Sequence, residues 1–220
     1  MHISEGVLSV PVLISGWGLT LAGTAAGIKK IKNEDIPKVA ILSSAFFVAS
    51  LIHVPFGVTS VHLILNGLLG ILLGWSAVPS ILIALLMQAV LFQYGGLSSL
   101  GVNTVIMALP AVLSYYIFRK ALRKKEPEDQ DIHDCEIKSI SISKFWSNNS
   151  LRITSFFCGT FTIAVSALLL GIALALSGDE FILAAKLAVM AHIPVMVIEG
   201  IITSSSVLFL KKVKPEALDL

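Results

Sequence analysis

Three potential metal donors lie together at the start of the chain, in the dipeptide Met1-His2. The free amine of Met1, the backbone nitrogen of His2 and the His2 imidazole can close two fused chelate rings around one metal ion. Nitrogen-rich square-planar or tetragonal sites suit Ni(II) and Cu(II), with Co(II) close behind, and fit Mg(II) and Ca(II) poorly. We expect Met1 to be the mature end, because the first apolar run is too long for a secretory signal and no basic region precedes it. The dipeptide therefore predicts a transition-metal chelator.

Three further histidines fall within or beside apolar segments, namely His53, His62 and His192. Ionisable residues in such segments are candidates for function, because burying them in a membrane is costly. His62 could supply a fourth nitrogen to the chelator, whereas a histidine at a helix end, such as His53, is more often a solvated interfacial residue. His192 and Glu199 are seven residues apart, so on a helix they share one face. They could form a proton relay or a second ion site, but we favour a polar pair that holds helices together.

The composition indicates which elements position these residues. Of all residues, 55% are hydrophobic and 14% are charged, and the mean hydropathy is +0.88. Such a chain is an integral membrane protein. About 20 apolar residues cross a bilayer core, and their backbone polar groups must bond within the segment, which favours helices. We predict an all-α, multi-pass transmembrane helical bundle, a single membrane domain over residues 1–220. Its seven spans cover residues 7–28, 37–53, 61–74, 78–92, 102–118, 153–176 and 181–210; the third is short, and Pro194 lies inside the last.

Positive charge is distributed unevenly along these spans. Of the sixteen Lys and Arg residues, all except Lys186 lie in the first connection, around the fifth connection or after the last span. The positive-inside rule then places those three regions in the cytoplasm, together with the C-terminus, and the N-terminus outside. The polar stretch 121–150 becomes a cytoplasmic loop. This orientation puts His53 and His62 on the same outer side as the N-terminal chelator.

Small residues recur at helical spacing in two of the predicted spans. Gly23 and Gly27 form a GxxxG pattern in the first span, and Gly70 and Gly74 form another in the third. Such patterns let helix backbones approach closely. We favour packing inside the bundle over a docking surface for another membrane subunit.

Four segments together resemble the CbiM/NikM family, the metal-binding membrane subunits of energy-coupling-factor cobalt and nickel importers. The segments extend over nearly the whole chain, and they are MHISEG at residues 1–6, TSVH at Thr59–His62, GGLSSLGVN at Gly95–Asn103 and IPVMVIEG at Ile193–Gly200. The resemblance implies a planar four-nitrogen site, in which Met1 contributes its amine, His2 its backbone and ring nitrogens, and His62 the fourth donor. It also implies three residues that anchor loops or support the ligands, namely Thr59, Ser60 and Asn103.

Two positions depart from the family's pattern. The cobalt-type pattern has proline, threonine and glycine directly after the histidine that corresponds to His62, whereas this chain has Leu63, Ile64 and Leu65. This difference favours the nickel-type branch. Other members carry glutamine at the position of His192, which favours a structural role for that histidine.

The resemblance implies a transporter subunit of the prokaryotic inner membrane that captures Ni(II) or Co(II) as its substrate and uses no organic cofactor. Its expected partners are a transmembrane coupling subunit, two ATPase subunits, an optional small accessory membrane subunit and the lipid bilayer, without nucleic acid. The chain contains no GxxxxGK[ST] motif, so ATP would be hydrolysed by partner subunits and the chain is not itself an enzyme. The alternatives are a stand-alone membrane metal carrier and a haem-binding electron-transfer protein with His53, His62 or His192 as axial ligands. A membrane metalloenzyme has little support, because no HExxH motif is present.

Overall fold

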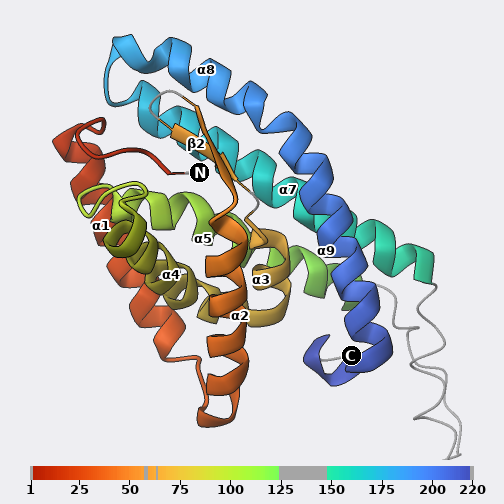
Figure 1. The fold of residues 1–220 in the computed structure, drawn as a ribbon. Helices are drawn as coiled ribbons and strands as arrows, with labels where there is room; N and C mark the ends of the chain where they lie inside the picture. Colours follow the sequence, from red (N-terminus) through yellow and green to blue (C-terminus); the bar gives the residue numbers. More distant parts are fainter. Residues whose placement is uncertain (1, 57–58, 63, 124–147, 219–220) are drawn as a thin grey trace, which may run out of the picture.

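A computed structural model describes residues 2–56, 59–62, 64–123 and 148–218 (Figure 1). Most of them are helical, and the helices are α1 Val10–Ile28, α2 Ile36–Ser50, α3 Asn66–Leu73, α4 Ala77–Phe92, α5 Leu100–Arg123, α7 Asn148–Ala175, α8 Ile182–Ala191 and α9 Ile193–Val213. Two short strands, β1 His53–Phe56 and β2 Thr59–His62, form an antiparallel ribbon between α2 and α3. Brief 3-10 turns cover Asn33–Asp35, Gly74–Ser76, Asp179–Phe181 and Pro215–Leu218.

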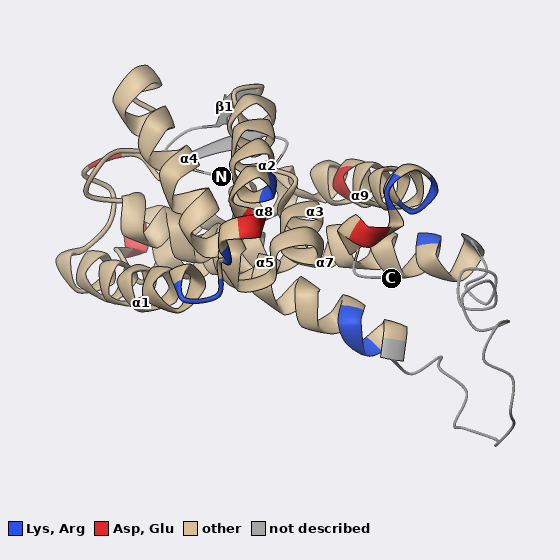
Figure 2. Ribbon diagram, turned by 90° about the horizontal axis from the view of Figure 1, so that it is seen from below, with Lys and Arg blue, Asp and Glu red and all other residues tan. Residues whose placement is uncertain are grey.

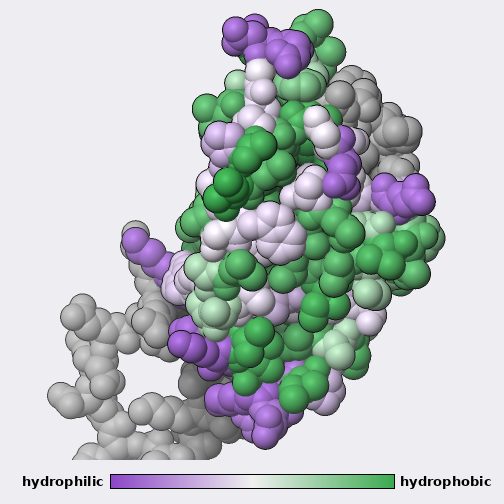
Figure 3. Space-filling view, turned by 90° about the vertical axis from the view of Figure 1, so that its left-hand side faces the viewer, coloured by the Kyte–Doolittle hydropathy of each residue, from purple (hydrophilic) through white to green (hydrophobic). Residues whose placement is uncertain are grey.

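Much of the helical surface is apolar. Five stretches of the described residues are long and apolar enough to cross a membrane: Val10–Ile28, Asn66–Phe92, Leu100–Leu122, Asn149–Ala175 and Asp179–Val213. Large aliphatic side chains point outward along them, and Figure 3 shows hydrophobic residues over most of one face, with hydrophilic residues mainly toward its two ends. The predicted helical membrane bundle is therefore confirmed, and the chain is a multi-pass membrane protein.

Helix α5 forms the centre of the bundle. Met107 and Ala111 on α5 have no exposed surface, and α1, α3, α4 and α7 all pack against this helix. The packing is close: a Cβ added to Gly70 of α3 would lie 2.1 Å from the Ala111 carbonyl oxygen. Glycine is therefore required where α3 crosses α5, as expected when small residues let membrane helices approach each other.

The third predicted span differs in the structure. We expected one helix over residues 61–74, but residues up to His62 belong to β2 and the helix begins only at Asn66. The β-branched residues Thr59 and Val61 favour strand geometry. Gly74 has φ +55° and ψ −123°, outside the helical region, so it separates α3 from α4. With eight residues, α3 is only about 12 Å long, too short to cross a membrane alone.

The last predicted span, residues 181–210, is divided into α8 and α9. The helices meet at His192, whose backbone N–H bonds to the Val189 carbonyl at 3.2 Å in a tighter turn. Proline causes this break, because Pro194 has no N–H to donate to the preceding turn and its ring crowds that turn. Pro194 occupies the first turn of α9, a position that tolerates proline.

Charged residues lie mainly at the ends of helices and in the connections, while the middle turns of the helices carry few charges (Figure 2). Lys29 follows α1, Lys38 is in the first turn of α2, and Lys211 and Lys212 are in the last turn of α9. These helix ends lie toward the lower edge of Figure 1, whereas β2 and the N-terminal segment lie in its upper part. The clustered lysines are thus at the opposite end of the bundle from His2. The predicted cytoplasmic loop 121–150 lies mostly outside the described residues.

Candidate metal centre

The N-terminal segment docks on the α4–α5 connection and on the first turn of α5 through the backbone of Ile3. The Ile3 N–H donates to Oδ1 of Asn103 at 2.9 Å, and the Asn103 amide donates back to the Ile3 carbonyl at 3.2 Å. The Ser99 hydroxyl donates to the same carbonyl at 2.9 Å. Because Ile3 is fully buried, these bonds also satisfy backbone groups that water cannot reach. Asn103, which the family resemblance marks as an anchoring residue, thus holds both backbone groups of the residue next to His2.

Glu5 makes a second attachment to the same connection. Its backbone N–H donates to the Gly95 carbonyl at 3.0 Å, and its carboxylate accepts the N–H groups of Leu97 at 3.0 Å and Ser98 at 3.2 Å. Hydrogen bonds from the Ser98 side chain and backbone, followed by that from Leu97, lower the pKa of the Glu5 carboxyl from its usual 4.5. A carboxylate that accepts several N–H groups favours its charged form.

His2 is held between these two attachments and is only 4% exposed. Its ring centroid lies 6.4 Å from that of Tyr94, in a tilted arrangement. Gly95 has φ +80°, and a Cβ there would lie 3.1 Å from Nδ2 of Asn103 and 3.6 Å from Cβ of His2. Glycine supplies this left-handed backbone without strain, so the connection can turn tightly beneath the N-terminal segment.

Helix α1 fixes the connection from its other side. The Trp17 indole donates to the Ser98 carbonyl at 3.0 Å, and the Thr20 hydroxyl donates to the Gly101 carbonyl at 2.6 Å. The support beneath His2 is therefore part of the rigid α1–α5 packing rather than a loop held only at its ends.

The remaining predicted ligands are placed only in part. Met1 lies outside the described residues, and His62 is described as the last residue of β2, with its backbone paired to that of His53. Thr59 and Ser60 belong to the same strand. The N-terminal segment and β2 both lie in the upper part of Figure 1, between α5 and α8. The four-nitrogen site of Met1, His2 and His62 remains a prediction.

Within the described residues, no three His, Cys, Asp or Glu side chains form a group that could hold a metal ion.

His192 and Glu199 are both fully buried, but each has its own partner. Nδ1 of His192 lies 2.6 Å from the Ala188 carbonyl oxygen in the preceding turn. Glu199 instead faces the residues just before α3, where its Oε2 accepts the Ile64 N–H at 3.4 Å. The two residues contact different elements, so the polar pair that we favoured from their spacing is not present as a hydrogen bond.

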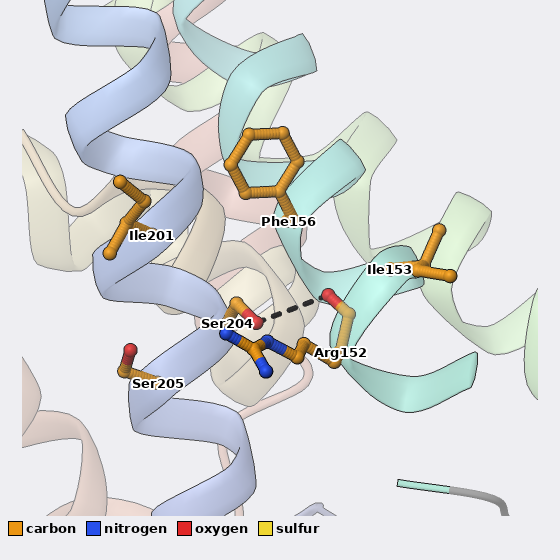
Figure 4. Close-up of a pocket in the computed structure, with 6 residues that line it drawn as sticks. All are labelled: Arg152, Ile153, Phe156, Ile201, Ser204 and Ser205. Carbon is orange, nitrogen blue, oxygen red and sulfur yellow. Dashed lines mark hydrogen bonds between the residues drawn. The ribbon is translucent and has the colours of Figure 1, made fainter. Parts of the chain in front are cut away.

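A groove of about 280 Å³ lies between α7 and α9. Figure 4 shows Phe156, Ile201 and Ser204 among its lining residues, with the Ser204 hydroxyl bonded to the Arg152 carbonyl at 3.1 Å. Its walls are mainly apolar. The groove offers no set of donors for a transition metal and is separate from the N-terminal segment.

The sequence did not predict the contacts of Glu5 and Ser99 or the partner of Glu199. The acidic residue inside MHISEG and the serine inside GGLSSLGVN were visible. Their hydrogen bonds, from Leu97 to Glu5 and from Ser99 to Ile3, join positions more than 90 residues apart, and no local pattern predicts them.

Comparison with known proteins gives a match over nearly all of the chain. A family model described as the cobalt uptake substrate-specific transmembrane region, CbiM, matches residues 2–217. A protein of Haemophilus influenzae, named for metal transport, is 37% identical over 219 residues, covering 100% of this chain and 97% of its own length. The fused nickel transport protein NikMN of Rhodobacter capsulatus is 33% identical over 115 residues, covering 50% of this chain and 33% of that protein. The crystal structure of a transition metal transporter superimposes with a TM-score of 0.76 and 27% identity, covering 97% of this chain and 93% of that one.

Proposed function

We propose, because the chain belongs to the CbiM family of cobalt uptake substrate-specific transmembrane regions, that it captures Ni(II) or Co(II) from outside the cell for ATP-driven uptake. In this proposal it is the substrate-binding subunit of an energy-coupling-factor transporter. A transmembrane coupling subunit and two ATPase subunits would supply the energy. A family model named for cobalt uptake and a relative named for nickel transport both support the class of substrate.

The metal would be held by four nitrogens in one plane. Met1 contributes its amine, His2 its backbone and ring nitrogens, and His62 its imidazole. Nitrogen donors in a square plane suit Ni(II), and the amine and the backbone amide must lose protons before they bind. Binding is therefore expected to release protons and to strengthen as the pH rises.

The observation that carries the proposal is the docking of a buried His2. A flexible N-terminal dipeptide would lose conformational entropy on chelation. Here the bonds from Asn103 and Ser99 to Ile3 and the bonds of Glu5 hold the segment before metal arrives. Positioning of this kind by surrounding hydrogen bonds strengthens metal sites.

Blocking the Met1 amine tests the proposal directly. The chain is prepared with its native N-terminus and, as a matched protein, with an N-terminal tag that is left in place. Isothermal titration with Ni(II) and with Co(II) is expected to show one site per chain in the first protein and none in the second. Stoichiometric binding by the tagged protein would contradict the proposed site.

A further inference from the structure

Glu199 is a fully buried carboxylate that faces the beginning of a neighbouring helix. It lies on α9, yet its Oε2 accepts the Ile64 N–H at 3.4 Å. The backbone N–H groups of Leu65, Asn66 and Gly67 face the same carboxylate. The Ile64–Gly67 backbone, at and just before the start of α3, therefore faces one side chain from α9, to which the Ile64 N–H donates.

Helix α3 needs this partner, because its own sequence provides no cap. The residue before it, Leu65, has the left-handed backbone angles φ 57° and ψ 20° and makes no side-chain capping bond. The first N–H groups of a helix have no partner within the helix, and inside a membrane water does not supply one. The Glu199 carboxyl of α9 supplies a polar partner beside this helix start, where its Oε2 accepts the Ile64 N–H, and it lies near the positive end of the helix dipole.

The position of this contact along the chain links it to the metal site. Ile64 lies two residues after His62, the last residue of β2. We propose that Glu199 is a positioning residue for His62: by holding the start of α3 against α9, it fixes where β2 ends and hence where the fourth nitrogen is presented. This inference rests on the proposed metal site.

Glu199 is not the only contact that holds α3 in place, so its loss is not expected to unfold this part of the bundle. The Asn66 amide lies 3.5 Å from the Ser166 hydroxyl of α7, and a Cβ on Gly67 would lie 2.7 Å from Cα of Gly159, also on α7. These contacts do not involve the carboxylate. Loss of the Glu199 carboxyl is therefore expected to leave α3 packed on α7 while the residues that begin it, Ile64 to Gly67, are held less firmly.

The same contact connects movement of α9 with the proposed metal site. Helix α9 is separated from α8 at His192 and extends to Lys212 at the opposite end of the bundle. A displacement of α9 by a partner subunit would move the carboxylate, and the residues it holds would follow. Release of the metal would then accompany movement of this helix.

The test compares Glu199→Gln with the control Ser204→Ala, which alters another buried polar residue of α9 whose hydroxyl bonds to α7, at the Arg152 carbonyl, and not to the start of α3. We expect Glu199→Gln to weaken Ni(II) binding about tenfold, the lower end of the effect of losing a residue that supports a metal ligand, and to change the visible absorption of square-planar Ni(II). Ser204→Ala is expected to bind with wild-type affinity and spectrum. Both variants should keep their melting temperature without metal to within a few degrees. Wild-type affinity and spectrum in Glu199→Gln would overturn the inference.

A second measurement uses the unchanged protein and does not depend on a variant folding. Ni(II) is expected to slow hydrogen exchange at the N–H groups of residues 64–67, because fixing His62 stabilises the segment that follows it. Identical exchange with and without bound Ni(II) would overturn the inference while leaving the metal site intact. A native chain that binds no Ni(II) at all would overturn the proposed function and this inference together.

Discussion

Glu5 and Asn103 act on the same short segment through different groups. Asn103 bonds the backbone of Ile3 from the buried side, whereas the Glu5 carboxylate bonds the N–H groups of Leu97 and Ser98 on the exposed side. Neither residue needs to contact a metal to affect binding. Together they hold His2 in place before a metal ion arrives, which lowers the conformational entropy that is lost on chelation.

The attachment through Glu5 should depend on pH. Because its folded-state pKa lies below the usual 4.5, the carboxylate stabilises the docked segment at neutral pH, and this contribution is lost as the pH falls through the lowered pKa. Without metal, hydrogen exchange at residues 3–6, corrected for intrinsic rates, is expected to speed up in that acidic range. Glu5→Gln should show the faster exchange already at neutral pH.

Glu216→Gln is the matched control, because Glu216 is an exposed acid near the other end of the chain. It should exchange at residues 3–6 as the wild type does. If Glu5→Gln also matched the wild type at neutral pH, the carboxylate would not hold the segment.

At the scale of elements, glycines on different helix faces have different roles. Gly23 and Gly27 of α1 face the bundle, where added Cβ atoms would approach Val78 and Pro79, whereas Gly18 has open space around it. The GxxxG pair of α1 therefore serves internal packing. In α3, Gly70 packs on Ala111, while Gly74 ends the helix.

Alanine at two of these glycines should affect stability in opposite directions. Gly70→Ala would place a methyl group 2.1 Å from a backbone oxygen, and the resulting separation of α3 and α5 is expected to cost about 1–3 kcal/mol. Its melting temperature in detergent should fall by several degrees. Gly18→Ala meets no neighbour and improves helix propensity by up to about 1 kcal/mol, so it should melt at or slightly above the wild-type temperature. Equal melting of Gly70→Ala and wild type would contradict the close crossing.

At the scale of the whole molecule, the arrangement of charge predicts an orientation. The lysines near the ends of α1 and α9 lie opposite the connection that holds His2. The positive-inside rule then places that connection outside the cell. Metal would be captured on the outer side, as an importer requires.

Cysteine labelling measures this orientation. In a background in which the two cysteines of the chain, Cys135 and Cys158, are replaced, Leu97→Cys should react in intact cells with a maleimide that cannot cross the membrane, because Leu97 is 55% exposed. Glu216→Cys should react only after the membrane is permeabilised. The reverse pattern would place the metal centre in the cytoplasm and contradict capture from outside.

The sequence predicted the membrane bundle because composition and apolar length determine the solvent of each segment. It did not predict the ribbon at residues 53–62, because hydropathy does not distinguish a short apolar strand from part of an apolar helix. The supports of His2 were also hidden, apart from Asn103, which came from the family resemblance. The contact between Glu5 and the Gly95 connection depends on a left-handed backbone at Gly95, and the contact between Glu199 and α3 depends on how two distant helices cross.

The burial of His2 has a kinetic consequence. With only 4% of the residue exposed, the His2 ring is shielded from a competing chelator in solution, so a metal held as proposed should not lose this ligand by direct attack. Dissociation would have to wait until residues 2–6 detach from the connection between α4 and α5. The rate of metal loss should therefore stop rising at high chelator concentration, at a limit set by the rate at which this segment opens.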